Sequence, residues 1–481
     1  MVVKHDLSFS KEVLSVISLK KSNIQQVFSW QSFVLNIFGL WYRSPADAPK
    51  GCTLQRVRHF IYLILIIPAT PISLYLVVRS LAALSGDQAV ADKEERPVVR
   101  ALALLPNIAI AIRAICVILF LSAGHIDLRG LICELEILVG STIPKEKLLR
   151  HLSRWTIFNT VVVIYCVGSF FPVCVLNGFH MTESLELATN GSVMLKPFTL
   201  EIPVWAYVML EAMFSWFPYV LSQLVLLCMV TSCLMVFDCF TALNNSLTAL
   251  EAKMPGVAGK ERQLEAELNW TGSCIELDLM TSEVETLMNA RAGLFHFIER
   301  LNHNLGFVIL FSYLSDVVST AGMLTVLVTH EEQSSVSFPA KLLGTIVFIS
   351  YATVLYIPMV LATESAGHTN LILYRITMEG YALIKAQVGN GLGNVLADFR
   401  LLITMFPVHL SAARIFHIDR NFIVASFSLL FTFAILLEEL LGQMSVKALI
   451  EQASNTSSLL EAMLGNSTNV SVTSHGGTDG L

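Results

Sequence analysis

Charged residues are scarce in this sequence of 481 residues. Lys, Arg, Asp and Glu make up 14% of the chain, against about 25% in a typical soluble domain. Hydrophobic residues reach 54%. Such a composition is typical of a protein embedded in a bilayer, with membrane lipid as its main surroundings. The formal net charge of -6 leaves no basic excess, so we expect no nucleic acid partner.

The sequence also lacks the spacings of a metal site or a disulfide framework. No two of the nine cysteines form a Cys-x-x-Cys pair, and most lie in apolar runs, where thiols act as small hydrophobic side chains. The twelve histidines contain no His-x-x-x-His pair. We therefore expect no metal, no cofactor and no enzymatic activity; an intramembrane zinc hydrolase is kept only as an alternative.

Seven apolar stretches are long enough to cross about 30 Å of hydrocarbon as helices. The fourth is too long for a simple span, so we expect it to tilt or to project beyond the membrane. The sequence thus predicts an all-α membrane protein with seven transmembrane helices. The predicted spans are 59–82, 98–122, 155–178, 202–236, 305–328, 340–362 and 418–441. The stretch 24–41 is amphipathic and aromatic and is expected at the membrane interface.

Lysine and arginine are concentrated on one side of these spans. Most of them lie in the N-terminal segment and in the connections after spans two, four and six. By the positive-inside rule, the N-terminus is cytosolic and the C-terminus, seven spans later, is extracellular. We expect a multi-pass protein of the plasma membrane.

Asn-x-Ser/Thr sequons agree with this orientation in part. One lies in the long loop between spans three and four, and three lie in the polar tail. Two further sequons, at Asn244 and Asn269, fall on the predicted inside. The sites expected to be glycosylated are Asn190, Asn455, Asn466 and Asn469.

This topology is the reverse of that of a G-protein-coupled receptor. The last span has no Asn-Pro-x-x-Tyr, and the third does not end in Asp-Arg-Tyr; Asp419 and Arg420 stand instead at the start of the last span. We expect no G protein to be required, although that class is kept as an alternative. A secondary transporter is another, but no internal repeat or pair of broken helices is visible.

The last apolar segment ends on two carboxylates. Residues 410–440 read LSAARIFHIDRNFIVASFSLLFTFAILLEEL and close with Glu438 and Glu439. A carboxylate at the end of a membrane helix is costly unless it faces water or a partner, which suggests a helix lining an aqueous path. Thr432, Ile435, Glu439 and Gln443 share one helical face. The alternative is that both carboxylates lie in water at the outer headgroup border.

Three segments resemble the insect gustatory and odorant receptors. They are 230–250, the stretch 290–311 with His296 and Asn302-x-x-x-Gly306-Phe307, and the closing segment. Gustatory receptors end on Thr-Tyr, five apolar residues and Gln-Phe; here Thr432 is kept, Phe433 replaces Tyr, and Glu439 replaces Gln. The chain is identified as a divergent member of the gustatory or gustatory-receptor-like branch.

The resemblance implies a ligand-gated, non-selective cation channel opened by a small-molecule agonist. It further implies a homotetramer, or a heterotetramer with related subunits, in which each last helix lines a central pore for permeant cations. The cytosolic helix ends would form a shared anchor; a bundle private to each subunit is the alternative. The pore residues would be Thr432, Ile435, Leu436, Glu439, Leu440 and Gln443.

The domain organisation expected on this basis follows the predicted spans. It comprises a cytosolic N-terminal segment (1–58), helices one to four with the ligand pocket (59–239), cytosolic anchor helices (240–304), helices five and six (305–362), further anchor helices (363–417), a pore-lining helix (418–441) and an extracellular tail (442–481).

The implied ligand pocket lies in the outer half of the bundle, among helices two, three, four and six. Glu211 and Arg113 are isolated charges in apolar runs, which are costly unless they pair with each other or meet a ligand. Asp316 is a similar case. Aromatic side chains there suit stacking on a ligand, but also an interfacial belt or a packed core. The candidates are Arg113, Tyr165, Trp205, Tyr207, Glu211, Trp216, Tyr219, Tyr351 and Tyr356. Nothing selects a sugar over an amine, an acid or a terpenoid.

Overall fold

The computed structural model describes residues 23–37, 97–122, 126–189, 192–195, 200–264, 270–328, 337–386, 391–433, 435–436 and 439. Most of this part of the chain is helical. Its long helices are α6 (Pro97–Ser122), α7 (Leu128–Thr142), α8 (Lys145–Thr189), α9 (Val204–Leu264), α10 (Trp270–Val328), α11 (Ser337–Ala386) and α12 (Gly391–Met405). Shorter elements are α2 (Asn23–Val27), α3 (Ser29–Ile37), β1 (Ser192–Leu195), β2 (Leu200–Pro203), β3 (Ser411–Ala412) and β4 (Phe416–His417). A final helical stretch, Arg420–Phe433, is called the last helix below.

The predicted spans from the second to the seventh fall on helices, whereas the first, 59–82, lies outside the described residues. Within the described part, two stretches are long and apolar enough to cross a bilayer, Tyr219–Lys253 and Asp278–Leu324. Ile108–Leu121 and Arg420–Phe433 are shorter apolar helices. This finding rests on length and composition, so the number of spans and the side of each terminus stay predictions.

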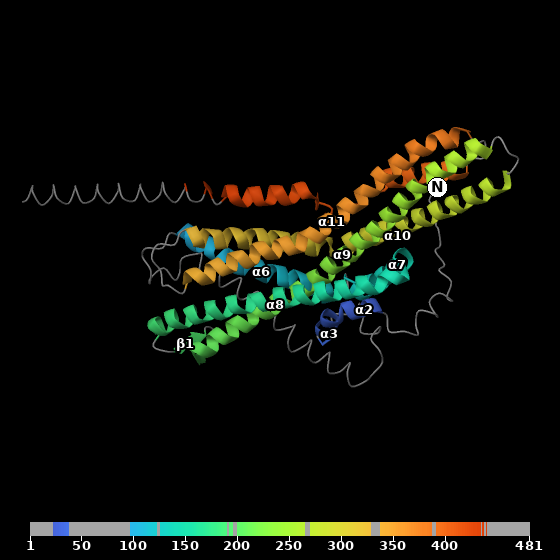
Figure 1. The fold of residues 1–481 in the computed structure, drawn as a ribbon. Coiled ribbons are helices and arrows are strands. Elements are labelled where there is room, and N and C mark those ends of the chain that lie inside the picture. The colour runs from blue at the N-terminus through green and yellow to red at the C-terminus, as the bar shows by residue number, and fades with distance from the viewer. Residues whose placement is uncertain are drawn as a thin grey trace, which may run out of the picture.

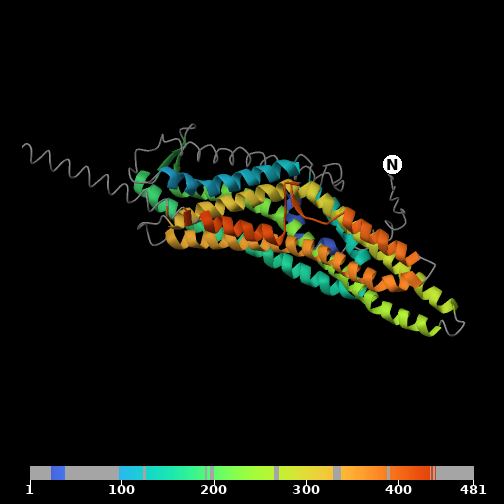
Figure 2. The ribbon, with the colours of Figure 1, turned by 90° about the horizontal axis from the view of Figure 1, so that it is seen from above.

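Three helices run most of the length of the molecule (Figure 1). They are α9, α10 and α11, with 61, 59 and 50 residues. At 1.5 Å per residue, α9 is about 90 Å long, roughly three times the thickness of the hydrocarbon core. The fourth predicted span thus continues as one helix far beyond residue 236. At one end α6 and α8 run beside these helices, and at the other end α12 does (Figures 1 and 2).

Each end has its own apolar core. The larger core joins α6, α7, α8, α9, α10 and α11 and is centred on buried side chains such as Val225, Val236 and Leu305. The smaller core joins the far parts of α9, α10 and α11 to α12. Apolar faces at the far end therefore meet within one chain. A shared anchor between subunits stays a prediction. The smaller core contains Leu243, Leu247, Leu250, Met280, Val284, Ile372, Leu373, Ile376, Leu392, Leu396, Phe399 and Ile403.

The connection between spans three and four differs from the expected loop. Helix α8 continues to Thr189, and the chain then forms an antiparallel hairpin in which Ser192 pairs with Pro203 and Leu195 with Leu200. Strands of four residues are too short for an alternating pattern to stand out from their surroundings, so periodicity did not reveal them.

The amphipathic N-terminal stretch packs against the bundle. Phe28 and Leu35 are fully buried in the larger core, whereas Trp30 and Phe33 are more than half exposed. A buried polar contact fixes this position: Asn159 of α8 donates to the carbonyl oxygen of Val27 at 2.6 Å.

A short non-helical segment between α12 and the last helix docks onto α10. The Asn302 side chain donates to the carbonyl oxygen of His409 at 2.8 Å and accepts from the Ser411 amide at 3.0 Å. One turn along α10, Gly306 lies so close to the β3–β4 turn that an added Cβ would sit 2.9 Å from the Ala413 nitrogen. The turn itself uses left-handed backbone at Ala413 and Arg414 (φ 51° and 62°).

We expect Gly306→Ala to destabilise the protein by about 1–3 kcal/mol, because the new methyl group meets backbone that cannot rotate away. Thermal unfolding of the purified, detergent-solubilised chain measures the effect. Gly367→Ala on α11 is the matched control, since an added Cβ there meets nothing within 4 Å and alanine favours a helix. Equal melting temperatures for the two variants would contradict the close contact.

Candidate functional site

A buried ion pair lies in the middle of the helix bundle. Arg113 of α6 donates to Asp316 of α10, with 2.9 Å between Nη1 and Oδ1, and both side chains are buried. The guanidinium also lies over the Tyr219 ring of α9, 5.1 Å from its centroid. Removing two charges from water costs several kcal/mol per ion, and close pairing only offsets that cost. Such a pair is therefore weak evidence for stability.

A stripe of buried hydroxyl groups surrounds this pair. Ser312, Ser315 and Ser319 recur with Asp316 at spacings of three and four residues, so they share one face of α10. The three serine hydroxyls, Asp316 Oδ2 and the Tyr356 hydroxyl of α11 are all buried without a hydrogen-bond partner in the described part of the chain. Buried polar groups are nearly always satisfied by protein, water or ligand. This polar centre can therefore receive water or hydrogen-bonding groups of a ligand.

The sequence located part of this polar centre. Arg113, Tyr219 and Tyr356, from three helices, are brought together around Asp316. The serine stripe was missed, although its spacing inside an apolar run was visible in the sequence. Arg113 has Asp316 as a partner; the side chain of Glu211, the partner first considered, lies outside the described residues.

The other predicted ligand residues stand apart or cannot be placed. Tyr165 is half-buried and hydrogen-bonded to Ser350. Trp205, at the start of α9, is 66% exposed. The side chains of Tyr207, Trp216 and Tyr351 lie outside the described residues, as do all four predicted glycosylation sites.

An aromatic cluster connects the polar centre to the last helix. The Tyr356 ring meets the Tyr313 ring edge-on at 6.0 Å, and Tyr313 lies 4.7 Å from Phe422 in the first turn of the last helix. The Tyr313 hydroxyl also hydrogen-bonds Ser426 at 2.8 Å. A change in packing around Tyr356 would thus reach the last helix through a single side chain. Phe416 of β4 stacks on Phe422 at 4.5 Å and completes the cluster.

Among its described residues, the last helix is partly buried along one side. Phe422, Ile423, Ser426, Leu430 and Phe433 are partly buried against the bundle. Most other positions are exposed, and large apolar side chains such as Leu429 (60%) and Phe431 (70%) face outward. Of the predicted pore residues, Thr432, Ile435, Leu436 and Glu439 are exposed, whereas Leu440 and Gln443 lie outside the described residues.

An exposed ion pair contacts the first residue of the last helix. Arg420 contacts Glu364 of α11 in a two-point geometry, Nε to Oε1 at 2.9 Å and Nη2 to Oε2 at 2.9 Å. The parallel contacts give this pair directional specificity. Glu364, two residues beyond the predicted sixth span, therefore connects α11 to the first residue of the last helix.

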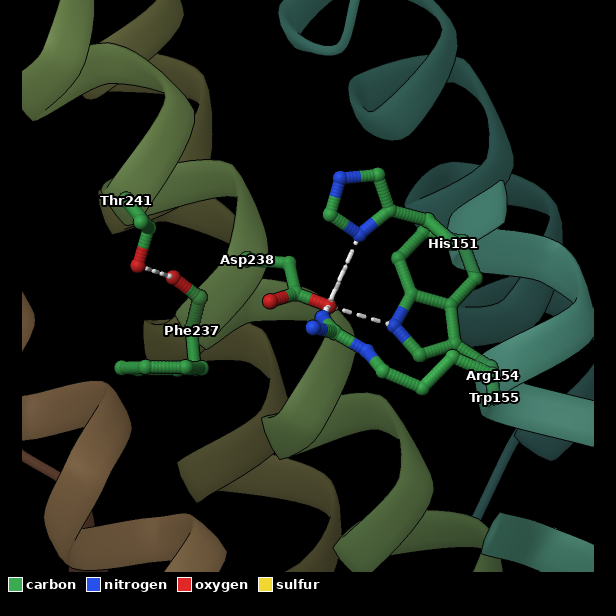
Figure 3. Close-up of polar contacts among 6 residues, drawn as sticks. All are labelled: His151, Arg154, Trp155, Phe237, Asp238 and Thr241. Carbon is green, nitrogen blue, oxygen red and sulfur yellow. Dashed lines mark hydrogen bonds and ion pairs between the residues drawn. The ribbon is translucent and has the colours of Figure 1, made fainter. Parts of the chain in front are cut away.

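At a similar level, a second polar cluster joins α8 to α9 (Figure 3). Asp238 is buried and accepts from Trp155 Nε1 at 2.6 Å. The same carboxylate oxygen pairs with Arg154 and lies 3.3 Å from His151 Nδ1. Thr241, one turn along α9, points away from this cluster and donates to the carbonyl oxygen of Phe237. Asp238 thus anchors one side of α9 and leaves the other side free to face α11.

Two histidines face each other beside the β3–β4 hairpin. The rings of His409 and His417 lie 4.8 Å apart. Burial, and next His417, lower the pKa of His409, while Asp419 acts in the opposite direction. A His whose pKa falls on folding binds its proton more tightly in the unfolded chain. The folded state therefore loses stability as the pH falls below the pKa of His409 in the unfolded chain.

The class of protein follows from a comparison with known families. The chain belongs to the 7tm chemosensory receptor family, whose profile matches residues 146–437. No curated protein shows a significant sequence match. The family assignment places the chain among chemosensory receptors rather than enzymes.

Two solved structures share the fold. The insect olfactory receptor OR5 from Machilis hrabei aligns with a TM-score of 0.56 at 9% identity, covering 85% of this chain and 98% of that one. The same receptor in complex with eugenol aligns with a TM-score of 0.60 at 11% identity, covering 87% and 100%. At these identities the likeness concerns the fold.

We expect Arg113→Met to destabilise the protein by about 3–5 kcal/mol, because Asp316 then stays buried without its cationic partner. The double variant Arg113→Met/Asp316→Leu removes both charges and should recover most of the loss. The stability of both variants is measured by heating the purified proteins and following the fraction that stays monodisperse. A double variant no better than the single one would show that the ion pair is not the reason for the loss.

Proposed function

We propose that this receptor is a ligand-gated, non-selective cation channel of the chemosensory type. A small-molecule agonist binds around the polar centre and opens a pore that the last helices line. The observation that carries this proposal is the set of unpartnered buried hydroxyls joined to the last helix by Tyr356, Tyr313 and Phe422. The solved neighbour that contains eugenol supports small-molecule binding by this fold.

The agonist would be a polar molecule of modest size. Three serine hydroxyls, a tyrosine hydroxyl and one carboxylate oxygen offer donors and acceptors inside an apolar bundle. A ligand that pairs with them is favoured over an isosteric hydrocarbon, because the hydrocarbon would leave those groups unsatisfied. On binding, it would shift Tyr356 and, through Tyr313, the first turns of the last helix.

The pore would be built by several subunits, in keeping with the tetramer implied by the family resemblance. A single last helix exposes apolar side chains on most of its surface, as expected if lipid or neighbouring subunits cover them. Exposed Thr432, Ile435 and Glu439 follow one another at helical spacing toward the predicted extracellular end. Because Thr432 keeps the gustatory motif, with Phe433 in the place of its Tyr, we place the receptor in the gustatory or gustatory-receptor-like branch.

Expression of the full chain alone, with recording of agonist-evoked currents against a chemical panel, tests this function. Polar, hydrogen-bonding agents should evoke cation currents that reverse near zero millivolts in symmetrical salt. The matched variant Ser315→Ala removes one hydroxyl of the polar centre, and Ser428→Ala removes one from the last helix outside it. Agonist potency that responds equally to both changes would argue against binding at the polar centre.

Permeation gives a separate prediction at Glu439. Four carboxylates around a narrow path raise cation occupancy and favour divalent ions. Glu439→Gln should therefore leave a working channel with lower relative calcium permeability, measured as the reversal potential in calcium against sodium. Glu438→Gln is the control, since 100° of helical rotation turns it away from the shared face. Wild-type selectivity in both variants would remove Glu439 from the permeation path.

The proposed topology places the N-terminus in the cytosol of a plasma-membrane protein and the C-terminal tail outside. An epitope at the C-terminus should accept antibody on intact cells, and an N-terminal epitope should do so only after permeabilisation. Glycosidase treatment should also reduce the apparent mass if sequons in the tail are used. A trafficked protein whose C-terminus stays hidden would contradict this orientation.

A further inference from the structure

A cavity opens between α9 and α11, away from the polar centre. Its volume is about 380 Å³. It begins just beyond the predicted fourth and sixth spans, which end at residues 236 and 362, so it faces the predicted cytosolic side. This volume exceeds what a bare ion needs and lies at the small end of the range for organic ligands. Polar lining comes from Thr241, Asn245 and Thr248 of α9 and from Glu364, Ser365 and His368 of α11.

The lining of this cavity is rich in hydrogen-bond acceptors. The Thr241 and Thr248 hydroxyls donate to helix carbonyl oxygens at 2.8 and 2.9 Å, which leaves their oxygen lone pairs for the cavity. Asn244 at its wall is already satisfied by Ser365 and Thr369. Among the lining residues that the structure describes, none is a lysine or an arginine, and Glu364 is the single carboxylate. The chemistry that fits such a lining is a cation that carries several N–H donors.

Glu364 serves this cavity and the last helix at once. Its two oxygens hold Arg420 in the two-point contact described above. A carboxylate offers about four lone-pair positions, so the Arg420 contact leaves room for further donors from the cavity side. A second positive charge at Glu364 weakens its hold on Arg420, because both cations then share one negative charge. The cavity is therefore coupled electrostatically to the start of the last helix.

We propose that this cavity is a regulatory site for a primary aliphatic amine supplied from the cytosolic side. The ammonium group donates to Glu364 and to the threonine hydroxyls, and its carbon chain lies along Phe237, Leu361 and Ile372. The same aminoalkyl group occurs in free diamines and in ethanolamine lipid headgroups. Occupancy loosens the Glu364–Arg420 pair and shifts the agonist response; this regulatory part rests on the proposed channel function, whereas the site itself does not.

Binding to the purified full-length chain is tested with putrescine, and 1,4-butanediol is the neutral probe of equal length. Putrescine should raise the melting temperature in a saturable manner, and butanediol should not. Glu364→Gln should weaken putrescine binding at least about tenfold, as expected for loss of a charge-assisted hydrogen bond. Thr248→Val, which keeps the shape and removes one hydroxyl, should weaken it less.

Two matched variants separate this site from general charge effects. Glu283→Gln removes an exposed carboxylate that pairs with Lys253 outside the cavity lining, and it should leave putrescine binding unchanged. Arg420→Gln should strengthen binding, because Glu364 is then released to the amine. Equal stabilisation by butanediol, binding that survives Glu364→Gln, or equal losses in Glu364→Gln and Glu283→Gln would each overturn the site.

Two lipid compositions separate the two sources of the amine. In nanodiscs of phosphatidylcholine, free putrescine should bind; added phosphatidylethanolamine should compete with it if the headgroup reaches the cavity. Absence of competition assigns the site to soluble amines. Choline headgroups carry no N–H donor and act as the control. Loss of putrescine binding in phosphatidylcholine, with binding retained in detergent, would show that the cavity is closed in a bilayer and would contradict the proposal.

The regulatory part is tested in excised inside-out patches. Putrescine on the cytosolic face should shift the agonist concentration for half-maximal current, and Glu364→Gln should abolish that shift. If an agonist-responsive channel binds putrescine but its half-maximal agonist concentration does not change, the regulatory role is wrong and the binding site still stands. A protein that binds putrescine but gives no agonist current would speak against the channel function, and the melting measurements would still decide the site.

Discussion

The docking of the 406–413 segment onto α10 is the contact on which the two ends of this receptor depend. One face of α10 contacts the segment at three positions. Arg291 donates to the Phe406 carbonyl oxygen at 2.9 Å, and Asn302 donates to the carbonyl oxygen of His409. Gly306, which has no side chain, lets the turn at Ala413 lie close to the helix. These positions are eleven and four residues apart, which keeps them in line on a helix. The segment follows α12 in one core and precedes the last helix beside the other. Its docking therefore fixes how the two cores and the last helix are aligned.

Several polar side chains lie buried inside the apolar bundle, where polar groups without hydrogen-bond partners destabilise the folded state most. Arg113 and Asp316 neutralise each other's charge, but the hydroxyls of the serine stripe and of Tyr356 have no hydrogen-bond partner in the described part of the chain. In a low-dielectric interior, each unsatisfied hydroxyl costs about 1–3 kcal/mol. A helix face that keeps such groups is better explained by a ligand or by water than by stability. Tyr313 then gives that face a mechanical connection to the last helix.

A second polar level lies where the long helices leave the predicted membrane region. Asp238 ties α9 to α8, and Glu364 ties α11 to the start of the last helix. The cavity between α9 and α11 lies between these two anchors. The last helix is thus approached from two directions: through aromatic packing from the polar centre, and through an ion pair from the cavity. The proposed agonist site and the proposed amine site are therefore connected to different residues in the first turns of this helix, Phe422 and Arg420.

The sequence by itself determined the helical membrane class, six of the helices and the chemosensory family, because apolar runs and motif order are local properties of the chain. It also marked Glu211, Arg113 and Asp316 as unusual charges in apolar runs and named Tyr219 as an aromatic ligand candidate. Only the tertiary structure decided that Arg113 and Asp316 pair across 203 positions and that Glu364 holds Arg420. It also decided that residues from 237–248 and 361–372 line one open cavity. Charge pairing and cavities depend on which helix faces meet, and that choice is made by long-range packing that a helical period does not encode.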